Sequence, residues 1–258
     1  MDLGLRERAY LVTGASSGVG LATARLLLDE GCSLAVCARD GDRLARELGP
    51  DGDRLVTTAA DVLDPEAVAR LTDAARRRFG RLDGVVNNAG GSLMAPWPDT
   101  TRIQWREELE LKLFSVLNTV EAALPLLSAS DAGAVVNVNA ILARQPEPRL
   151  AATSAARAAL LNLTRTLADD FGPRGIRVNS VCLGLIDTGQ WRRRHEAEGG
   201  ALDYTQWSAR LAADRGIPLG RLGTAEEVAF PIASLLSPRS AYITGATVDV
   251  GGGVGRYV

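Results

Sequence analysis

The sequence TGASSGVG at residues 13–20 decides how the rest of the chain is interpreted. It directly follows an apolar run at residues 8–13 and opens a helical pattern that extends to about residue 30. Glycines in such a loop let the backbone turn tightly and approach a pyrophosphate, whose charge then meets the amino-terminal end of the helix. A glycine-rich pattern alone is weak evidence, but its place between a first strand and a first helix favours a dinucleotide site over an ordinary turn.

Apolar runs alternate with helical patterns along the chain. Strands are predicted at residues 8–13, 33–38, 54–59, 82–87, 134–138, 176–182 and 246–250, with long helices at 101–128 and 150–171. The run Gly133–Val138 is apolar almost throughout, as in sheets that helices cover on both faces. We therefore expect an α/β fold, a doubly wound parallel sheet of Rossmann type with about seven strands.

The chain shows no internal repeat and no linker, so residues 1–258 are expected to form one domain. The pattern loosens only at about residues 185–223, which are polar and rich in Arg, and this segment is expected to be an insertion on the substrate side.

Composition limits the possible partners and surroundings. A net charge of −2 over 258 residues gives no long-range attraction to nucleic acid or to an anionic membrane. No apolar stretch approaches the length of about 18 residues that a membrane span needs, and the first eight residues are too charged for a signal peptide. The three cysteines form no CxxC pair, which favours buried, reduced thiols over a disulfide or a metal site. A cytoplasmic protein that acts on a small molecule, without a metal, is expected.

Several further motifs resemble those of the short-chain dehydrogenase/reductase family, over about residues 6–250. They are the spacing of the glycines in the loop, DV at 61–62, NNAG at 87–90, RVN at 177–179 and IDT at 186–188. The resemblance implies a nicotinamide cofactor, with the adenine beside Asp61 and Val62 and the nicotinamide amide held by Ile186 and Thr188. Thr188 can alternatively cap the following helix.

The resemblance also implies which residues of this chain contact the cofactor. They are Gly14, Ser16, Ser17, Gly18, Val19, Gly20, Arg39, Asp61, Val62, Asn88, Ala89, Gly90, Arg157, Gly184, Ile186 and Thr188. The pair Leu183-Gly184 stands where the family commonly has Pro-Gly.

Charge at the end of the second strand indicates the choice of cofactor. A carboxylate there accepts from the ribose 2′-OH of NAD, whereas an Arg accommodates the 2′-phosphate of NADP. Arg39 occupies this place, and Asp40, one residue later, is interpreted as a cap for the next turn. NADP is therefore expected rather than NAD.

The resemblance fails where the family carries its catalytic Asn, Ser, Tyr and Lys. By spacing, these positions fall on Lys112, Ala140, Thr153 and Arg157. The family mechanism needs a Tyr hydroxyl of lowered pKa as general acid or base, and an aliphatic hydroxyl at Thr153 is too weak an acid to replace it. Ala140 offers no hydrogen bond, whereas Arg157 can still bind the nicotinamide ribose.

Lys112 is the most informative of these changes, because it is the single lysine among 29 basic residues. A partly buried ammonium with a lowered pKa can act as an acid or bind an anionic substrate. A solvated lysine on a helix surface is the alternative, and the sequence does not decide between them.

Weaker candidates lie around this centre. Asn139 can donate to a substrate oxygen or merely satisfy backbone groups at the end of its strand. The rigid segment 145–149 would border the cleft. His195 and Trp191 lie in an Arg-rich run that is interpreted first as an exposed helix face, and alternatively as a cover over a carboxylate-bearing substrate.

The leading hypothesis is an NADP(H)-dependent oxidoreductase that acts on a small carbonyl or alcohol with a non-standard proton donor. A catalytically silent NADP-binding protein with a regulatory or assembly role is the main alternative, and a non-redox isomerase or lyase is another. By resemblance a homodimer or homotetramer is expected, and the small residues Ala151, Ala155, Ala158 and Ala159 would permit close packing of the long helix.

Overall fold

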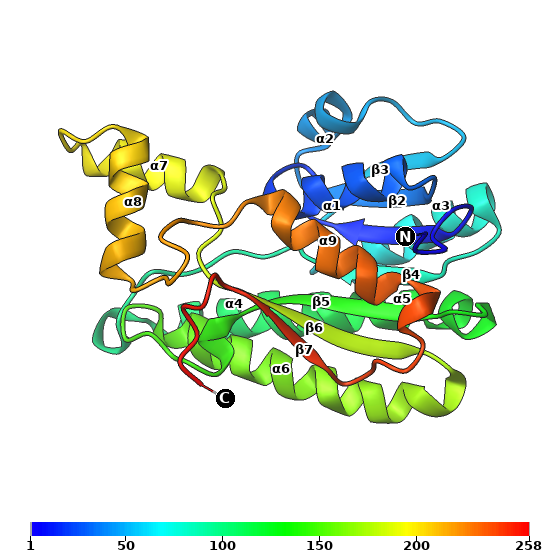
Figure 1. Ribbon diagram of the computed structural model, residues 1–258. Helices are drawn as coiled ribbons and strands as arrows, with labels where there is room; N and C mark the ends of the chain where they lie inside the picture. The colour runs from blue at the N-terminus through cyan, green and yellow to red at the C-terminus, as the bar shows by residue number, and fades with distance from the viewer. Residues whose placement is uncertain (1, 258) are drawn as a thin grey trace.

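The computed structural model describes residues 2–257, and its strands form one parallel sheet in the order β3-β2-β1-β4-β5-β6-β7 (Figure 1). The strands are β1 (Ala9–Thr13), β2 (Ser33–Ala38), β3 (Leu55–Ala59), β4 (Gly84–Asn87), β5 (Ala134–Ala140), β6 (Arg177–Leu183) and β7 (Thr247–Val250). The direction of winding reverses between β1 and β4, and open α/β sheets bind ligands at the carboxyl ends of the strands beside such a reversal. The predicted doubly wound sheet is confirmed.

Helices cover both faces of the sheet. The α-helices are α1 (Gly18–Asp29), α2 (Gly41–Leu48), α3 (Pro65–Phe79), α4 (Arg102–Leu109), α5 (Ser115–Ala129), α6 (Ala151–Phe171), α7 (Gly189–Glu198), α8 (Tyr204–Asp214) and α9 (Ala225–Leu236). Single 3-10 turns occur at Trp97–Asp99, Ile141–Ala143, Gly172–Arg174 and Pro238–Ser240. One apolar core lies beneath α1, α2 and α9, and a second lies beneath α3, α5 and α6 (Figure 1). All three cysteines are buried and free, as predicted.

The element boundaries follow local sequence signals closely. The carboxylate of Asp64 accepts from the backbone N–H groups of Glu66 and Ala67, at 2.9 and 3.1 Å, and so caps α3. Asp40 likewise caps α2, with its Oδ1 2.9 Å from the backbone nitrogen of Arg43.

The predicted long helix at 101–128 differs from the structure. A π-helical turn, Glu110–Phe114, separates α4 from α5, and the backbone N–H of Ser115 donates to the carbonyl of Glu110. Such turns add one residue to the hydrogen-bonded ring and occur frequently at functional sites.

The helical run Arg102–Ala129 also corrects the expectation that no apolar stretch is long enough for a membrane span. Its mean hydropathy of 1.3 over 18 residues and its 28-residue length suffice on those two criteria alone. Within the fold, α5 packs against α3 and β4 as one of the helices that flank the sheet.

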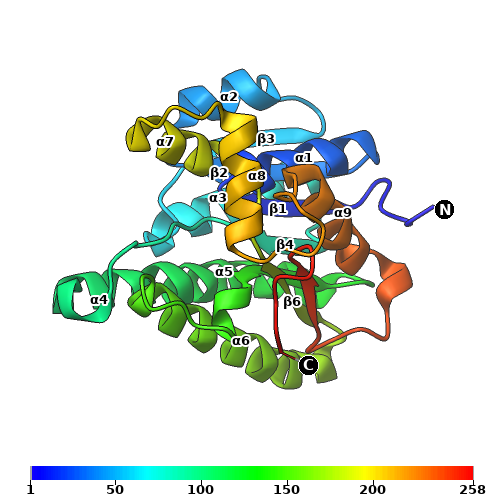
Figure 2. The ribbon, with the colours of Figure 1, turned by 60° about the vertical axis from the view of Figure 1, so that its left-hand side comes forward.

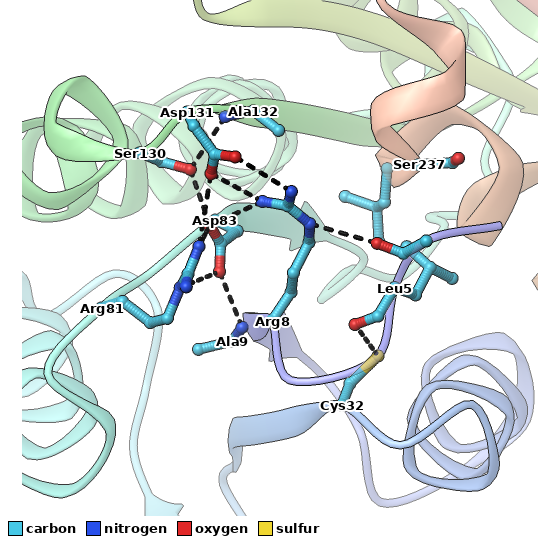
Figure 3. A network of polar contacts seen from close by, with 12 residues as sticks. Leu5, Arg8, Ala9, Cys32, Arg81, Asp83, Ser130, Asp131, Ala132 and Ser237 are labelled. Carbon is cyan, nitrogen blue, oxygen red and sulfur yellow. Dashed lines mark hydrogen bonds and ion pairs between the residues drawn. The ribbon is translucent and has the colours of Figure 1, made fainter.

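A buried ion network fixes the edge of the sheet away from the predicted site (Figure 3). The carboxylate of Asp83, which is fully buried, accepts hydrogen bonds from Arg8, Arg81, Ser130 and the backbone N–H of Ala9. Burial opposes the ionisation of Asp83, but these hydrogen bonds outweigh it and lower the pKa of the carboxyl group. The network therefore joins the amino ends of β1 and β4 to the turn before β5.

The insertion forms the two helices α7 and α8, which stand beside the carboxyl edge of the sheet (Figures 1 and 2). They contact each other, and Ala212 of α8 packs with Cys182 of β6 and Ile141 in a small apolar cluster. The segment in which the sequence pattern loosens is therefore largely helical, and this cluster joins it to the sheet.

Candidate active site

The glycine loop joins β1 to α1 at the carboxyl edge of the sheet. Gly14 and Gly18 have φ angles of 68° and 54°, which side chains with a Cβ adopt only with strain. A Cβ on Gly20 would lie 2.4 Å from the carbonyl oxygen of Gly14, and one on Gly14 would lie 2.9 Å from the Cα of Ala89. The three glycines thus allow a packed loop whose backbone is bare toward a ligand.

The end of β4 holds this loop in place. The side-chain amide of Asn88 donates to the carbonyls of Thr13 and Gly14, at 2.9 and 3.2 Å. The hydroxyl of Thr13 accepts from the backbone N–H groups of Asn88 and Ala89, both at 3.0 Å. Asn88 therefore braces the loop instead of presenting its amide to a ribose, which leaves Ala89 and Gly90 for the predicted contact.

The amino-terminal end of α1 is prepared for an anion. Ser17 stands at the N-cap, yet its side chain accepts no capping hydrogen bond, and the first turn carries no acidic residue. The backbone N–H groups and the positive end of the helix dipole therefore remain available to a negative group. Ser16 is half-buried beside them, and Val19 anchors the helix in the core. This cradle fits the diphosphate of a dinucleotide.

Two further segments border the cradle. Arg39 is exposed at the end of β2, and no ion-pair partner for it is found among residues 2–257. Asp61 is exposed after β3, where its carboxylate accepts from the backbone N–H of Leu63 at 3.0 Å. Val62 is buried, and its carbonyl accepts from the side chain of Asn118 at 3.0 Å.

The segment after β6 returns to the glycine loop. A Cβ on Gly184 would lie 2.7 Å from the Cα of Gly251, so only glycine permits this close approach. Ile186 is buried, and Thr188 places its methyl group 3.3 Å from the position of a Cβ on Gly18. Thr188 is the N-cap residue of α7, but its side chain makes no capping hydrogen bond. Its hydroxyl therefore stays free for another partner.

Where α4 and the π-helical turn pack against α6 lies a buried ionic cluster of Glu108, Lys112 and Thr153, called the Lys112 cluster below. The Lys112 Nζ atom donates to Glu108 Oε2 at 2.8 Å, and the Thr153 hydroxyl donates to the same oxygen at 2.5 Å. The Lys112 side chain is only 2% exposed. The alternative of a solvated surface lysine is therefore wrong.

Thr153 has a supporting place in this cluster. Its hydroxyl donates to Glu108 and accepts from the backbone N–H of Leu93 at 3.0 Å. A hydroxyl has one proton to donate, and here that proton is committed to a carboxylate. Thr153 therefore supports the carboxylate of Glu108 rather than offering its proton to a substrate.

Asn139 also departs from its predicted role. It is fully buried, with its amide oxygen accepting from the backbone N–H of Ala140 at 2.9 Å and its amide nitrogen donating to the carbonyl of Arg157 at 3.1 Å. Both polar atoms are thus satisfied by the backbone. The second alternative that the sequence allowed, a residue that satisfies backbone groups, describes Asn139.

Arg157 lies between the end of β5 and the NNAG segment. Its Nη1 donates to the carbonyl of Val138 at 2.8 Å, and its Nη2 is 3.7 Å from the position of a Cβ on Gly90. Its Nε atom is buried and has no partner among the described residues. Nη2 donates to none of the described residues and lies beside Gly90, so it is the donor that fits the predicted contact with the ribose.

The charge of Lys112 reflects opposing influences. Burial lowers the pKa of its ammonium group, as does the nearby Arg157, whereas the hydrogen bond and charge of Glu108 raise it. The balance leaves the pKa of Lys112 below the ordinary lysine value. An ammonium with a lowered pKa is a stronger acid near neutral pH.

The α7–α8 insertion is held together by Trp191, His195, Tyr204 and Trp207, whose rings lie 5.5 to 6.3 Å apart. The Tyr204 hydroxyl donates to Asp187, which lies beside Thr188. His195 is half-buried, with its Nε2 atom 2.8 Å from the carbonyl of Leu202. Arg192 and Arg193 are exposed, as the interpretation of an exposed helix face expects, whereas Trp191 and His195 are half-buried against α8.

The insertion contacts two segments outside it, at Met94 and at Glu147. Arg194 Nη1 lies 3.6 Å from the sulfur of Met94, which follows Leu93 in the chain. Arg215 Nη1, at the end of α8, lies 2.6 Å from Glu147 Oε1 in the segment 145–149. This segment therefore borders the insertion. Among residues 2–257, no group of three His, Cys, Asp or Glu side chains is placed to hold a metal ion.

Comparison with known proteins places this geometry in a family. A family model described as enoyl-(acyl carrier protein) reductase matches residues 14–255. The chain is 39% identical over 250 residues to cis-4-hydroxycyclohexanecarboxylate dehydrogenase of Sinomonas cyclohexanicum, covering 96% of each protein. It is 31% identical over 252 residues to 3-oxoacyl-[acyl-carrier-protein] reductase FabG of Vibrio cholerae, covering 98% and 99%. The chain belongs to the short-chain dehydrogenase/reductase family.

Solved structures of other short-chain dehydrogenases/reductases resemble it closely. A short-chain oxidoreductase of Pseudomonas aeruginosa PAO1, described as containing an atypical catalytic center, is 47% identical with a TM-score of 0.92 and full coverage of both chains. Its NADPH-bound structure gives 46% identity, a TM-score of 0.90 and 98% coverage of both chains. L-Sorbose reductase of Gluconobacter frateurii, complexed with NADPH and L-sorbose, is 29% identical with a TM-score of 0.92 and full coverage of both chains. The chain is thus an oxidoreductase of this family, with NADPH-bound structural neighbours.

Sequence reasoning about this short-chain dehydrogenase/reductase missed Glu108. Its carboxylate joins Lys112 and Thr153, although it stands in a charged run with Glu107 and Glu110 and resembles a surface residue. One signal was available, because an acidic residue four positions before the single lysine faces it on a helix. The contact of Tyr204 with Asp187 had no comparable signal, since the two lie 17 positions apart.

Proposed function

We propose that this short-chain dehydrogenase/reductase interconverts a small carbonyl compound and its alcohol with NADP(H), and that Lys112 supplies the proton. The observation that carries the proposal is the buried ammonium of Lys112, 2.8 Å from the carboxylate of Glu108, which also holds Thr153. NADPH, when bound, supplies a hydride to the carbonyl carbon. The ammonium of Lys112 gives one proton to the carbonyl oxygen, which completes the alcohol, and the resulting amine is reprotonated from water.

The chain's own groups divide the remaining tasks. The glycine loop and the amino-terminal end of α1 would hold the diphosphate, and Arg157 would orient the ribose through its free N–H donors. Ala140 gives no hydrogen bond to the substrate oxygen. The proposal therefore assigns Lys112 both tasks at that oxygen, orientation and proton transfer.

The preference for NADP rests on Arg39. Its exposed guanidinium lies at the end of β2, and the adjacent carboxylate of Asp40 is occupied in capping α2. A 2′-phosphate would thus meet the unpaired guanidinium of Arg39 rather than a carboxylate, which would repel it. The NADPH-bound neighbours support the same choice.

A substrate panel tests the activity. Purified protein with NADPH is offered ketones, 2-oxo acids and imines, including 4-oxocyclohexanecarboxylate, which corresponds to the alcohol in the name of the Sinomonas relative. The proposal predicts turnover of at least one class, and loss of that turnover in Lys112→Met with NADPH binding retained. Absence of turnover across the panel, with NADPH bound, would favour the silent cofactor-binding alternative.

The silent alternative draws on two observations. Ala140 cannot hydrogen-bond to a substrate, and the proton of Thr153 is committed to Glu108. It predicts that NADPH binds without any exchange of hydride. Isotope exchange between deuterated NADPH and a bound carbonyl compound separates the two functions.

We propose that the protein assembles as a homodimer or homotetramer through its long helices. Ala155 and Ala158 are exposed on α6, so this face lacks a covering element within residues 2–257. Small side chains permit close approach of a second helix. Light scattering of the purified protein gives the oligomeric state.

A further inference from the structure

We infer that Glu108 is a positioning residue that keeps Lys112 protonated and holds its ammonium in place. This inference rests on the proposed role of Lys112 as proton donor, but it concerns a residue that neither the family motifs nor the sequence patterns single out. It is carried by the geometry of the Lys112 cluster.

The hydrogen bonds of Glu108 are distributed unequally between its two oxygens. Oε2 accepts from both Lys112 and Thr153, at 2.8 and 2.5 Å. Oε1 accepts from no described residue, yet it is not sealed off, since the side chain retains 10% exposure. The carboxylate is therefore fixed at one oxygen by two donors, and that oxygen is the atom that holds the ammonium.

The ammonium of Lys112 keeps protons for a substrate. Nζ carries three N–H donors, and one of them is used by Glu108. The other two donate to none of the described residues, and the Lys112 side chain is only 2% exposed. On the proposed function, these are the donors that a substrate oxygen would use.

The negative charge of Glu108 stabilises the buried ammonium of Lys112. The groups that face Lys112 are the carboxylate of Glu108 from α4 and, from α6, the guanidinium of Arg157 and the hydroxyl of Thr153. Arg157 and burial both disfavour a second positive charge, and Glu108 alone favours it. A buried ammonium without its counter-ion gives up its proton rather than stay charged.

The single lysine of the chain makes Lys112 directly observable. Labelling with 13C,15N-lysine gives one side-chain signal in the full-length protein, because the sequence contains no other lysine. Following the 13Cε shift against pH measures the pKa of Lys112 without any substrate. The titration is run on the protein saturated with NADP+ and repeated without it.

Glu108→Gln is the deciding variant, because it keeps the shape of the side chain and removes its charge. The neighbouring Glu107→Gln is the matched control, since Glu107 is exposed and the substitution changes net charge equally. We expect Glu108→Gln to lower the pKa of Lys112 by about one unit or more, the size of effect that a close opposite charge exerts. Glu107→Gln should leave it unchanged, and Glu108→Asp should restore part of the loss.

The criterion is the pKa of Lys112 in Glu108→Gln compared with its pKa in Glu107→Gln. The threshold is a fall of about half a pKa unit, which is half of the smallest effect expected. A larger fall supports the inference, and a smaller fall, no change or a rise overturns it. If Glu108→Gln does not fold, Glu108→Asp decides, because its shorter side chain must also lower the pKa of Lys112 measurably. A merely structural role would change thermal stability and leave this titration unmoved.

The titration also separates this inference from the proposed function. Suppose that the pKa of Lys112 falls in Glu108→Gln as expected, but no substrate is turned over. That result would refute the proton-donor role and leave the coupling of Glu108 to Lys112 intact. Turnover that depends on Lys112, with a titration indifferent to Glu108, would do the reverse.

Discussion

The proposed chemistry of this protein depends on single residues that the family motifs do not include. Lys112 and Glu108 are both buried, and each charge would be unfavourable there without the other. Their pairing explains how a charged lysine is tolerated at the position where the family carries its catalytic Asn. Lys112 could be singled out as the only lysine, although the sequence did not decide whether it is buried or solvated. The hydrogen bond of the Thr153 hydroxyl to Glu108 could not be predicted, because the two residues are 45 positions apart.

At Arg39, a substitution should alter the choice of cofactor. Arg39→Ser should weaken NADPH binding by about 10- to 100-fold, the range expected for losing hydrogen bonds to a charged group. NADH binding should change little, because it lacks the 2′-phosphate. Fluorescence titrations measure both, with Arg46→Ser on the exposed face of α2 as the control. Equal losses for the two cofactors would contradict the assignment.

At Gly20, even one methyl group should be damaging. A Cβ there meets the carbonyl oxygen of Gly14 at 2.4 Å, and backbone cannot move aside cheaply. Gly20→Ala should therefore destabilise the fold by about 2 kcal/mol, as overpacking does, and should abolish NADPH binding. Gly172→Ala, where a Cβ has nothing within 4 Å, is the control. Thermal unfolding and calorimetry give the two quantities, and normal cofactor affinity in Gly20→Ala would refute the close packing.

Elements were predictable where a local pattern specifies them. Every strand was found to within about two residues of its bounds, since apolar runs and turn signals repeat the period of a covered parallel sheet. The π-helical turn Glu110–Phe114 was not found, because one extra residue in a helix leaves no mark in the periodicity. The arrangement of α7 and α8 was also unpredictable, since side-chain contacts between them fix it.

The insertion should loosen when its tie to the cleft is cut. The Tyr204 hydroxyl donates to Asp187, and burial together with that hydrogen bond raises the pKa of Tyr204 to about 12, so the hydroxyl stays protonated at neutral pH. Tyr204→Phe should increase hydrogen exchange over α7 and α8 and leave the sheet unaffected. Tyr242→Phe, at a fully exposed ring, is the control. Unchanged exchange in Tyr204→Phe would show that the other contacts of the insertion hold it without this hydrogen bond.

The stability of the whole fold depends on contacts at the amino-terminal edge of the sheet, opposite the glycine loop. There the Asp83 network ties β1 and β4 together, with Asp83 fully buried and its partners partly exposed (Figure 3). Removing one partner of a buried pair leaves the other uncompensated. The doubly wound fold was predictable from the glycine loop and the strand pattern, but this network was not, because its members come from separate segments.

Asp83→Asn should lower the free energy of unfolding by about 3 kcal/mol, the lower end of the range for a broken buried pair. Asp131→Asn, at a side chain that is 71% exposed, should cost far less. Chemical denaturation measures both. A loss below that of Asp131→Asn would contradict the importance of the network.

The same carboxyl group should make the fold sensitive to acid. The pKa of Asp83 is lowered in the folded protein, so its stabilisation is complete above the unfolded value of about 3.9 and is lost as pH falls through the folded value. In Asp83→Asn this acid-dependent part of the stability should be absent. Unfolding free energies at pH 7 and at successively lower pH provide the comparison.

The proton-donor role of Lys112 is tested most directly by the pH dependence of carbonyl reduction with NADPH, measured in the wild type and in Lys112→Met. Because the pKa of Lys112 lies below the ordinary value of 10.5, wild-type kcat/KM should fall about tenfold per unit as pH rises through that lowered pKa. Lys112→Met should be slow and without this alkaline limb. The same alkaline limb in both proteins, at similar rates, would contradict the account.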